Sequence, residues 1–348
     1  MMNKPTCCDI FCAVIDNYGD AGVCWRLAHQ LANEYGWRVR LWIDDPAPLQ
    51  QLAPDHAAGP VELRVWKMPW QDTEIVDVVI EAFACELPPA YIEAMATRVR
   101  QPVWLNLEYL SAESWVAGCH GMSSPHPRLP LVKHFFFPGF APGTGGLLRE
   151  LDYDARRKGF DESAFRTEFG LPPRSPDELT VSLFSYPDNR ALSELMRAWE
   201  NSERPLRVLR PGSGETARTS GKLSVYPLPF LPQRRYDELL WACDLNFVRG
   251  EDSFVRAQWA GKPFVWQAYP QTDETHLAKL DAFLALHPAG GQLAGSWRAW
   301  NGEGALDWPG FAAGLPSLGA PMAEWATTLA ARPDLAARLV QFCLERLK

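Results

Sequence analysis

The chain has 348 residues, 47% of them hydrophobic and 22% charged, and it contains no low-complexity run. This length suits two α/β domains better than one compact core. The formal net charge of −8 argues against nucleic acid as a ligand, because phosphate binding depends on clustered lysine and arginine.

The sequence carries no signal-peptide pattern, and no apolar run approaches the roughly 20 residues that would span a membrane. None of the eight cysteines forms a C-x-x-C pair or groups with histidine at zinc spacing, so we expect reduced, mostly buried thiols. We therefore expect a cytoplasmic monomer that binds neither membrane nor nucleic acid.

The first half of the chain alternates apolar strands with helical or loop segments. We predict strands at Ile10–Ile15, Trp37–Ile43, Val61–Met68, Val76–Phe83, Pro102–Leu107 and His134–Pro138. An amphipathic helix is predicted over Val23–Tyr35, ending at Gly36. Such alternation is typical of a mostly parallel sheet with right-handed crossovers, which indicates a Rossmann-like domain.

The turn Asp16-Asn17-Tyr18-Gly19-Asp20 follows the first predicted strand. It lacks the G-x-G-x-x-G of a dinucleotide site, which argues against a nicotinamide or flavin enzyme. One interpretation is that Asp20 only caps the next helix. The other is that Asp16 and Asp20 together face a ligand, since two carboxylates suit a cationic or proton-donating acceptor and a cap needs only one.

Residues 138–173 are rich in glycine, proline and charge, and they connect the two halves. Asp152-Tyr153-Asp154 has the spacing of a metal-binding D-x-D, but it follows no strand and precedes Arg156-Arg157-Lys158, so we interpret it as a solvated charged face. The glycine-rich stretches 142–146 and 211–214 lack G-K-[ST], and neither H-E-x-x-H nor G-x-S-x-G occurs. We therefore expect no metal and no serine-hydrolase mechanism.

The second half repeats the alternation of strands and helices. Strands are predicted at Leu179–Ser185, Leu206–Leu209, Leu223–Pro227, Leu245–Val248 and Pro263–Gln267. Helices are predicted at Ala191–Asn201, Arg235–Cys243 and Glu274–Leu286, and the tail Met322–Lys348 is helical with a break at Pro333. Aromatic residues near the strand ends, Phe184, Tyr186, Phe230 and Tyr236, could stack on a base that Gln233 reads, although each alone could be a core residue.

The stretch VRGEDSFVRAQWAGKPFVW, starting at Val248, is predicted to form a turn, a helix and a strand. Ser253 or Asp252 is placed as the N-cap of this helix. The helix N-terminus offers free N–H groups that suit a diphosphate. Alternatively the acidic residues only cap the helix, but Arg249, Glu251 and Asp252 are more than a cap requires.

These patterns predict an α/β protein with two Rossmann-like domains facing each other across a central cleft, as in glycosyltransferases and many other two-domain proteins. We place the first domain at residues 1–175 and the second at 176–334. The helix at 335–348 is expected to pack back onto the first domain.

Three segments resemble the bacterial protein-arginine rhamnosyltransferases that modify elongation factor P, the EarP family. They are DNYGDAGVCWRLAHQLA, WLNLEYLSAESWVAGCHGMSSPHPRLPLVKHFFFPGFAPGTGGLLRE and RGEDSFVRAQWAGKPFVW, and the similarity extends over nearly the whole chain. The resemblance implies a GT-B fold and inverting transfer of L-rhamnose from dTDP-β-L-rhamnose to one arginine of elongation factor P, with no metal and no cofactor besides the donor.

The resemblance also assigns roles to residues. It implies that Asp20, Asp16 and Glu251 are catalytic, with Asp20 as the general base or acceptor-orienting group. The residues implied to bind the donor are Asn17, Tyr18, Gly19, Phe184, Tyr186, Phe230, Gln233, Tyr236, Arg249, Glu251, Asp252 and Ser253.

Two alternatives stay open. One is a GT-B glycosyltransferase with a small-molecule or lipid acceptor, which the paired aspartates disfavour. The other is a non-catalytic, two-lobed nucleotide-binding protein, which would need the donor turn but neither Asp16 nor Asp20. An oxidoreductase ranks third, and an absorbance scan for bound cofactor would test it.

Overall fold

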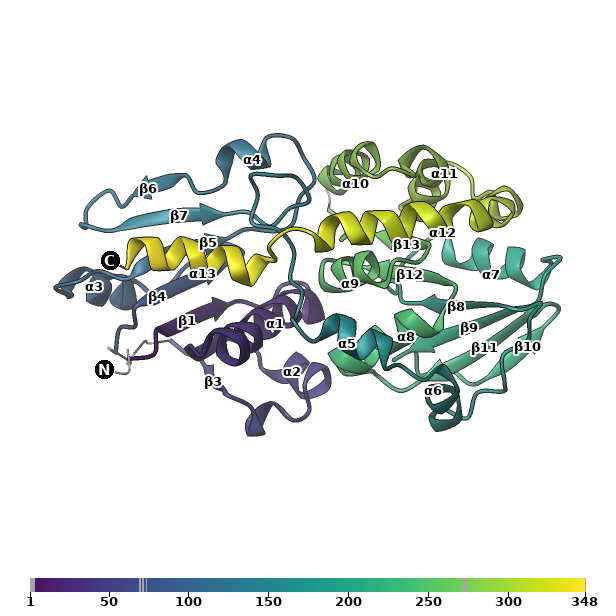
Figure 1. Ribbon diagram of the computed structural model, residues 1–348, viewed down its shortest axis with the longest axis horizontal. Coiled ribbons are helices and arrows are strands. Elements are labelled where there is room, and N and C mark those ends of the chain that lie inside the picture. The colour runs from purple at the N-terminus through teal and green to yellow at the C-terminus, as the bar shows by residue number, and fades with distance from the viewer. Residues whose placement is uncertain (1–3, 69, 71, 73, 272–273, 348) are drawn as a thin grey trace. The chain divides into compact units, whose positions relative to one another are not determined.

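The computed structural model describes residues 4–68, 70, 72, 74–271 and 274–347 (Figure 1). The chain divides into two compact units. Unit 1 comprises residues 1–151 and 332–348, and unit 2 comprises residues 152–331.

Within the described residues, unit 1 contains one sheet of seven strands in the order β3-β2-β1-β4-β5-β7-β6. Its strands are β1 (Cys7–Cys12), β2 (Arg38–Ile43), β3 (Val61–Val65), β4 (Val78–Ala82), β5 (Val103–Leu107), β6 (Ser123–Pro125) and β7 (Val132–Phe136). All neighbours pair in parallel except β6 and β7. Its helices are α1 (Asn17–Tyr35), α2 (Ala47–Leu52), the 3-10 helix His56–Ala58, α3 (Pro89–Thr97), α4 (Val116–Cys119) and α13 (Leu335–Arg346).

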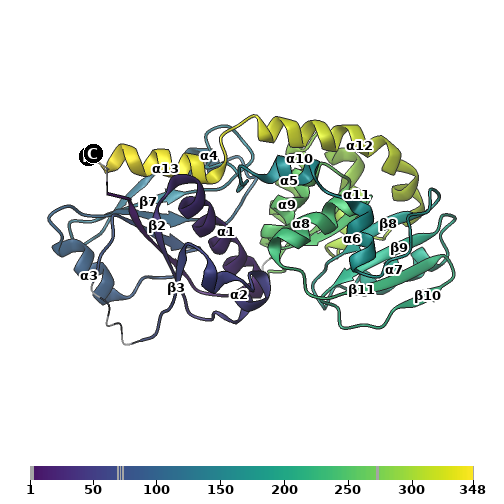
Figure 2. The same cartoon turned by 60° about the horizontal axis from the view of Figure 1, so that its bottom comes forward.

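Helix α1 packs on this sheet and ends as predicted at Gly36, whose φ of 66° is in the left-handed region that glycine tolerates. The C-terminal helix α13 lies beside α1 (Figure 2). Asp334 caps α13 by accepting hydrogen bonds from the N–H groups of Ala336 and Ala337. The Gln30 side chain of α1 donates to the same Asp334 oxygen at 3.1 Å, so the cap also holds α13 on unit 1.

Unit 2, over the part of the chain that the structure describes, contains one sheet of six strands in the order β10-β11-β9-β8-β12-β13. Its strands are β8 (Leu179–Leu183), β9 (Leu206–Pro211), β10 (Arg218–Ser220), β11 (Leu223–Leu228), β12 (Leu245–Arg249) and β13 (Phe264–Gln267). Only β10 pairs in the antiparallel sense. Its helices are α5 (Tyr153–Lys158), α6 (Glu162–Glu168), α7 (Leu192–Glu200), α8 (Gln233–Ala242), α9 (Asp252–Ala260), α10 (Thr275–Leu286), α11 (Gly290–Trp300) and α12 (Trp308–Ala330).

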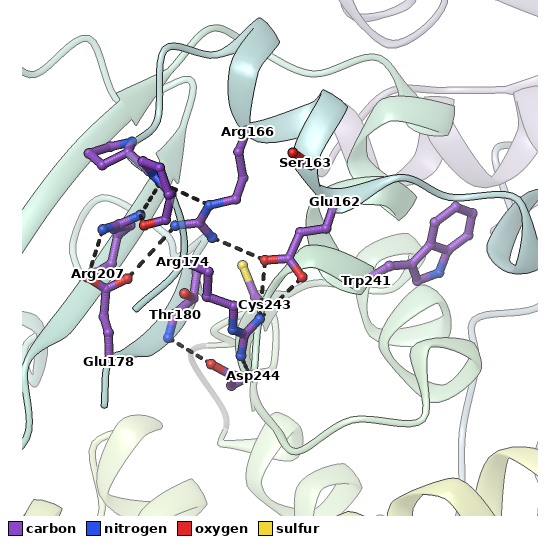
Figure 3. A network of polar contacts seen from close by, with 12 residues as sticks. Glu162, Ser163, Arg166, Arg174, Glu178, Thr180, Arg207, Trp241, Cys243 and Asp244 are labelled. Carbon is purple, nitrogen blue, oxygen red and sulfur yellow. Dashed lines mark hydrogen bonds and ion pairs between the residues drawn. The ribbon is translucent and has the colours of Figure 1, made fainter. Parts of the chain in front are cut away.

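The boundary between the units differs from the predicted one, because residues 152–175 belong to unit 2. Figure 3 shows the polar network that anchors this segment at the amino ends of β8, β9 and β12. Arg174 pairs with both Glu162 and Asp244, and Asp244 also accepts the N–H of Thr180 at the start of β8. Ion pairs therefore tie the connection to the unit 2 sheet, which composition alone does not reveal.

The segment around Asp152 is mostly the solvated charged face that we predict, since Asp152, Asp154, Arg157 and Lys158 are exposed, and it departs from the prediction at Tyr153 and Arg156. Tyr153 is 1% exposed, and its hydroxyl accepts a hydrogen bond from the Trp241 indole at 2.8 Å. Arg156 bonds to Asp237 of α8 at 3.1 Å, and Arg157 donates to the Trp259 carbonyl of α9. α5 thus packs on α8 and α9 through Tyr153 and Arg156, with Arg157 adding one hydrogen bond to α9 from an exposed position.

Helix α12 begins well before the predicted tail helix at Met322. Pro316 and Pro321 lie inside it, and their lack of an N–H makes them helix breakers in a sequence-based prediction. All eight cysteines are free thiols. Among the residues described here, no helix is both long and apolar enough to cross a membrane.

Candidate functional site

The loop between β1 and α1 lies at the point where the strand order of unit 1 reverses. β1 has β2 on one side and β4 on the other, so the chain leads to opposite sides of the sheet from this strand. In open α/β sheets, ligands bind outside the carboxyl ends of the strands at such a switch point. Asp16 and Asp20 lie in this position.

Asp20 holds the loop together. Its side chain is 2% exposed, and Oδ2 accepts hydrogen bonds from the backbone N–H groups of Ile15 and Asp16, both at 2.9 Å. α1 already begins at Asn17, so Asp20 lies in the first turn, where the positive end of the helix dipole favours a carboxylate. The carboxylate therefore binds the preceding loop and is not a conventional N-cap.

Asp16 is the partly exposed N-cap residue of α1 and makes no side-chain cap hydrogen bond. Its carboxylate lies against Gly19, where an added Cβ would be 2.6 Å from Asp16 Oδ2. Glycine is therefore required for this placement of the carboxylate. The Tyr18 hydroxyl donates to Gln51 of α2 at 3.0 Å, and the side chain of Asn17 lies outside the described part of the structure.

The loop after β4, the neighbour of β1, has strained backbone. Phe83, Ala84 and Glu86 have φ values of 57°, 53° and 54°, which non-glycine residues rarely adopt. The Ala84 N–H is held by the Asn106 side chain at 3.1 Å, and Phe83 stacks on Tyr109 with ring centroids 4.4 Å apart. Strain of this kind costs about 1–3 kcal/mol per residue and concentrates at functional sites.

Unit 2 repeats the arrangement, because β8 lies between β9 and β12. The loops after β8 and β12 therefore occupy the switch point of the second sheet. They carry half of the residues that the resemblance implies bind the donor. Phe184 and Tyr186 follow β8, and the turn Arg249–Ser253 follows β12.

The turn after β12 differs from the prediction in its cap. Gly250 has a φ of 59°, and Glu251, in the α region, is the N-cap of α9 without a side-chain cap hydrogen bond. The predicted cap by Ser253 or Asp252 is wrong, because both lie in the first helical turn. The Ser253 hydroxyl instead accepts the Arg249 N–H at 3.0 Å and donates to the Arg249 carbonyl, which closes the turn.

Arg249 lies between two aromatic rings of the other loop. Its guanidinium carbon is 4.2 Å from the Phe184 ring centroid and 4.7 Å from the Tyr186 centroid, within cation–π range. Nη1 donates to the Ser185 carbonyl at 2.8 Å. The structure thus brings Arg249, Phe184 and Tyr186 into one cluster.

The remaining aromatic and amide residues extend this cluster. Gln233 begins α8 and donates to Asp252 of α9 at 3.3 Å. Tyr236 packs on Phe184 with ring centroids 5.6 Å apart, and burial raises the pKa of its phenol well above the ordinary value, so it stays neutral. Phe230 is half-buried over Gly212, whose absent Cβ leaves room for the ring.

Sequence reasoning missed three polar residues around this cluster. Asp237 and Arg256 are both fully buried and form an ion pair at 2.7 Å between α8 and α9. Gln267, 5% exposed at the end of β13, accepts the Tyr186 N–H at 2.9 Å. Gln267 could have been found from the sequence, because it is a polar residue at the carboxyl end of an apolar strand. The Asp237–Arg256 ion pair could be found only from the tertiary structure. No group of three or more His, Cys, Asp or Glu residues suited to a metal occurs among the residues the structure describes.

Comparison with known proteins agrees with this geometry. A family model described as Elongation-Factor P (EF-P) rhamnosyltransferase EarP matches residues 8–344. A protein-arginine rhamnosyltransferase of Pseudomonas aeruginosa is 46% identical over 96% of this chain and 98% of its own. The chain belongs to the EarP family. The corresponding protein of Shewanella oneidensis is 38% identical over 96% of both chains.

Solved structures place this EarP family member in the GT-B fold. A structure described as the structural basis for EarP-mediated arginine glycosylation of translation elongation factor EF-P covers 98% of this chain, with a TM-score of 0.68 and 35% identity. Arabidopsis thaliana UGT89C1 in complex with UDP covers 99% with a TM-score of 0.56 at 11% identity, which bears on the fold alone. The predicted fold class of two Rossmann-like α/β domains is confirmed.

Proposed function

We propose that this EarP family member transfers L-rhamnose from dTDP-β-L-rhamnose to an arginine of elongation factor P, with inversion and without a metal. One observation carries the proposal. The two switch points hold complementary chemistry, with the carboxylates of Asp16 and Asp20 in unit 1 and the aromatic–arginine cluster beside the α9 N-terminus in unit 2.

Unit 2 is proposed to bind the donor. Flat side chains such as Phe230 suit a thymine ring, and the Gln233 amide can read its polar edge. The N-terminus of α9 carries the positive end of the helix dipole, which suits the diphosphate. Glu251 would repel phosphate, so we assign it to the hydroxyls of the sugar.

Unit 1 is proposed to bind the acceptor arginine. A guanidinium has a pKa above about 12, so a carboxylate cannot deprotonate it before reaction. We assign Asp20 to take the proton as the new N–C bond forms, when the nitrogen becomes strongly acidic. Asp16, which is more exposed, would bind the guanidinium and orient the attacking nitrogen.

The proposed step balances as one displacement. The guanidinium nitrogen forms a bond to the anomeric carbon as the bond from that carbon to the phosphate oxygen breaks. The proton goes to Asp20 and dTDP leaves, with the helix N–H groups stabilising the diphosphate. Attack from the face opposite the leaving group converts a β-linked donor into an α-linked product through an oxocarbenium-like state.

The test is intact-mass analysis of purified elongation factor P after incubation with the protein and dTDP-β-L-rhamnose. The expected result is a gain of one deoxyhexose that maps to an arginine. Binding of dTDP without any gain would favour a different acceptor. A protein that neither binds dTDP nor modifies the factor would overturn the proposal. We further propose that the enzyme acts as a cytoplasmic monomer, which size-exclusion chromatography with light scattering would test for the oligomeric state.

A further inference from the structure

One peptide group in the loop after β8 is held at both of its polar atoms. The Ser185 carbonyl accepts a hydrogen bond from Arg249 Nη1 at 2.8 Å. The next N–H, that of Tyr186, donates to Gln267 Oε1 at 2.9 Å. These two atoms belong to the same planar peptide, so its orientation is set by two side chains from β12 and β13.

The orientation of this peptide determines where the flanking rings point. Phe184 precedes the Ser185–Tyr186 peptide, and Tyr186 supplies its N–H. The Arg249 guanidinium carbon lies 4.2 Å from the Phe184 ring centroid and 4.7 Å from the Tyr186 ring centroid. The Arg249 backbone is in turn bound by Ser253 in the first turn of α9. We call these contacts of Arg249 and Gln267 with the Ser185–Tyr186 peptide the clamp. The clamp links the β8 loop to the turn that begins α9.

Gln267 is itself rigidly placed. Its carbonyl accepts the Gly250 N–H at 3.0 Å. On either side of it along the chain, the Asn301 side chain donates to the Trp266 carbonyl at 2.8 Å and accepts the Ala268 N–H at 2.9 Å. Asn301 thus binds the backbone as a neighbouring strand would. Gln267, 5% exposed, is fixed by these bonds to the residues before and after it and by its own carbonyl.

We propose that Gln267, together with Arg249, is a positioning residue for the nucleotide site of unit 2. It acts by fixing the Ser185–Tyr186 peptide so that Phe184 and Tyr186 are set for the donor before the donor binds. The inference rests on the proposed function, because it concerns the dTDP end of the same site. Gln267 needs no contact with the donor in this role.

The test compares Gln267→Met with Gln267→Glu. Methionine has a similar size but no oxygen, so the Tyr186 N–H loses its acceptor, whereas glutamate keeps an oxygen at the same place. We expect Gln267→Met to weaken dTDP binding, measured by calorimetry, and to raise the donor KM at least tenfold while kcat changes less than threefold. Gln267→Glu retains the hydrogen bond but adds a negative charge near the proposed diphosphate site, so it serves as the control for exchange of the Tyr186 amide and not for dTDP affinity.

A second readout does not depend on activity. Hydrogen exchange of the Tyr186 amide in the ligand-free protein should become faster in Gln267→Met and stay slow in Gln267→Glu. Unchanged exchange and unchanged dTDP affinity in Gln267→Met would overturn the proposal. So would equally fast exchange of this amide in both variants, because the lost oxygen would then not be the cause. If exchange responds as expected but the original protein fails to use dTDP-β-L-rhamnose, the clamp stands and the proposed function fails.

The pairing with Arg249 is tested by a double variant. Arg249→Lys removes the flat guanidinium that spans both rings and the Ser185 carbonyl. If both side chains act on one peptide, the rise in dTDP Kd of the double variant is smaller than the product of the two single rises. A rise equal to that product would show that the two residues act independently.

Discussion

Asp20→Asn separates two roles that the structure gives to one side chain. Asp20 Oδ2 accepts two backbone N–H groups at 2.9 Å, and the asparagine carbonyl oxygen can accept both in the same place. The substitution therefore keeps the β1–α1 loop and removes only the ability to take a proton. We expect thermal stability close to that of the original protein and unchanged binding of dTDP.

The expected loss lies in turnover. General-base catalysis contributes about 10²–10⁴-fold in rate, which corresponds to about 3–5 kcal/mol of barrier. Asp20→Ala is the matched control, because it leaves two loop N–H groups without their acceptor at a cost of about 1–3 kcal/mol each. Its transition temperature should fall, whereas that of Asp20→Asn should not.

The assay is single-turnover mass spectrometry of elongation factor P at saturating dTDP-β-L-rhamnose, with melting curves and dTDP calorimetry on the same preparations. Near-normal turnover in Asp20→Asn would refute the assignment of Asp20 as the base and leave it only the loop-holding role. Asp16→Asn is run in parallel. A large loss there, with none in Asp20→Asn, would transfer the role of base to Asp16.

Three further predictions concern unit 2. Glu251→Ala should weaken binding of dTDP-β-L-rhamnose at least tenfold in calorimetry while dTDP itself binds almost unchanged, since Glu251 is assigned to the sugar; equal weakening of both would contradict this. Asp237→Ala leaves Arg256 buried without its partner and should cost about 3–5 kcal/mol in urea unfolding; a cost below about 1 kcal/mol would contradict the buried pair. Burial lowers the pKa of His287 to about 4, so below about pH 6.5 the unfolded state takes up the proton first, and stability falls as the pH decreases towards 4. In His287→Asn the amide can still accept the Ala289 N–H. Relative to this variant, the free energy of unfolding of the original protein should fall by about 2 kcal/mol between pH 7 and 5. If the free energies of unfolding of the two proteins change in parallel with pH, His287 is not linked to stability.

Apolar patterning predicts much of this fold because its parallel strands are buried on both faces. β4, β5 and β8 are buried at every position, and each lies within a predicted strand. Glycine at the ends of α1 and α9 was equally informative, since Gly36 and Gly261 both adopt the left-handed conformation. Strand order was not predictable from these patterns, because pairing depends on contacts between distant segments.

Polar contacts that the sequence pattern does not reveal explain the errors. Ser253 has the sequence position of a cap, but its hydroxyl bonds to Arg249 across the turn. Arg156 follows an acidic motif and resembles a surface charge, yet it bonds to a buried Asp237 that lies 81 positions away. In each case residue type is compatible with two roles, and only the partner brought by the fold decides between them.

In both units the first strand lies between the second strand and a later one, but the groups at the two switch points differ, and the proposed reaction gives a physical reason. A guanidinium needs carboxylates such as Asp16 and Asp20, which would repel a diphosphate at the same edge. A diphosphate is suited by the positive end of a helix such as α9, whereas at α1 the Asp20 carboxylate lies in the first turn and offsets the same dipole, as a guanidinium requires. One switch point could therefore not serve both substrates well. Repeating the Rossmann-like unit provides two edges of the same geometry, and each can then be adapted to a substrate of one charge.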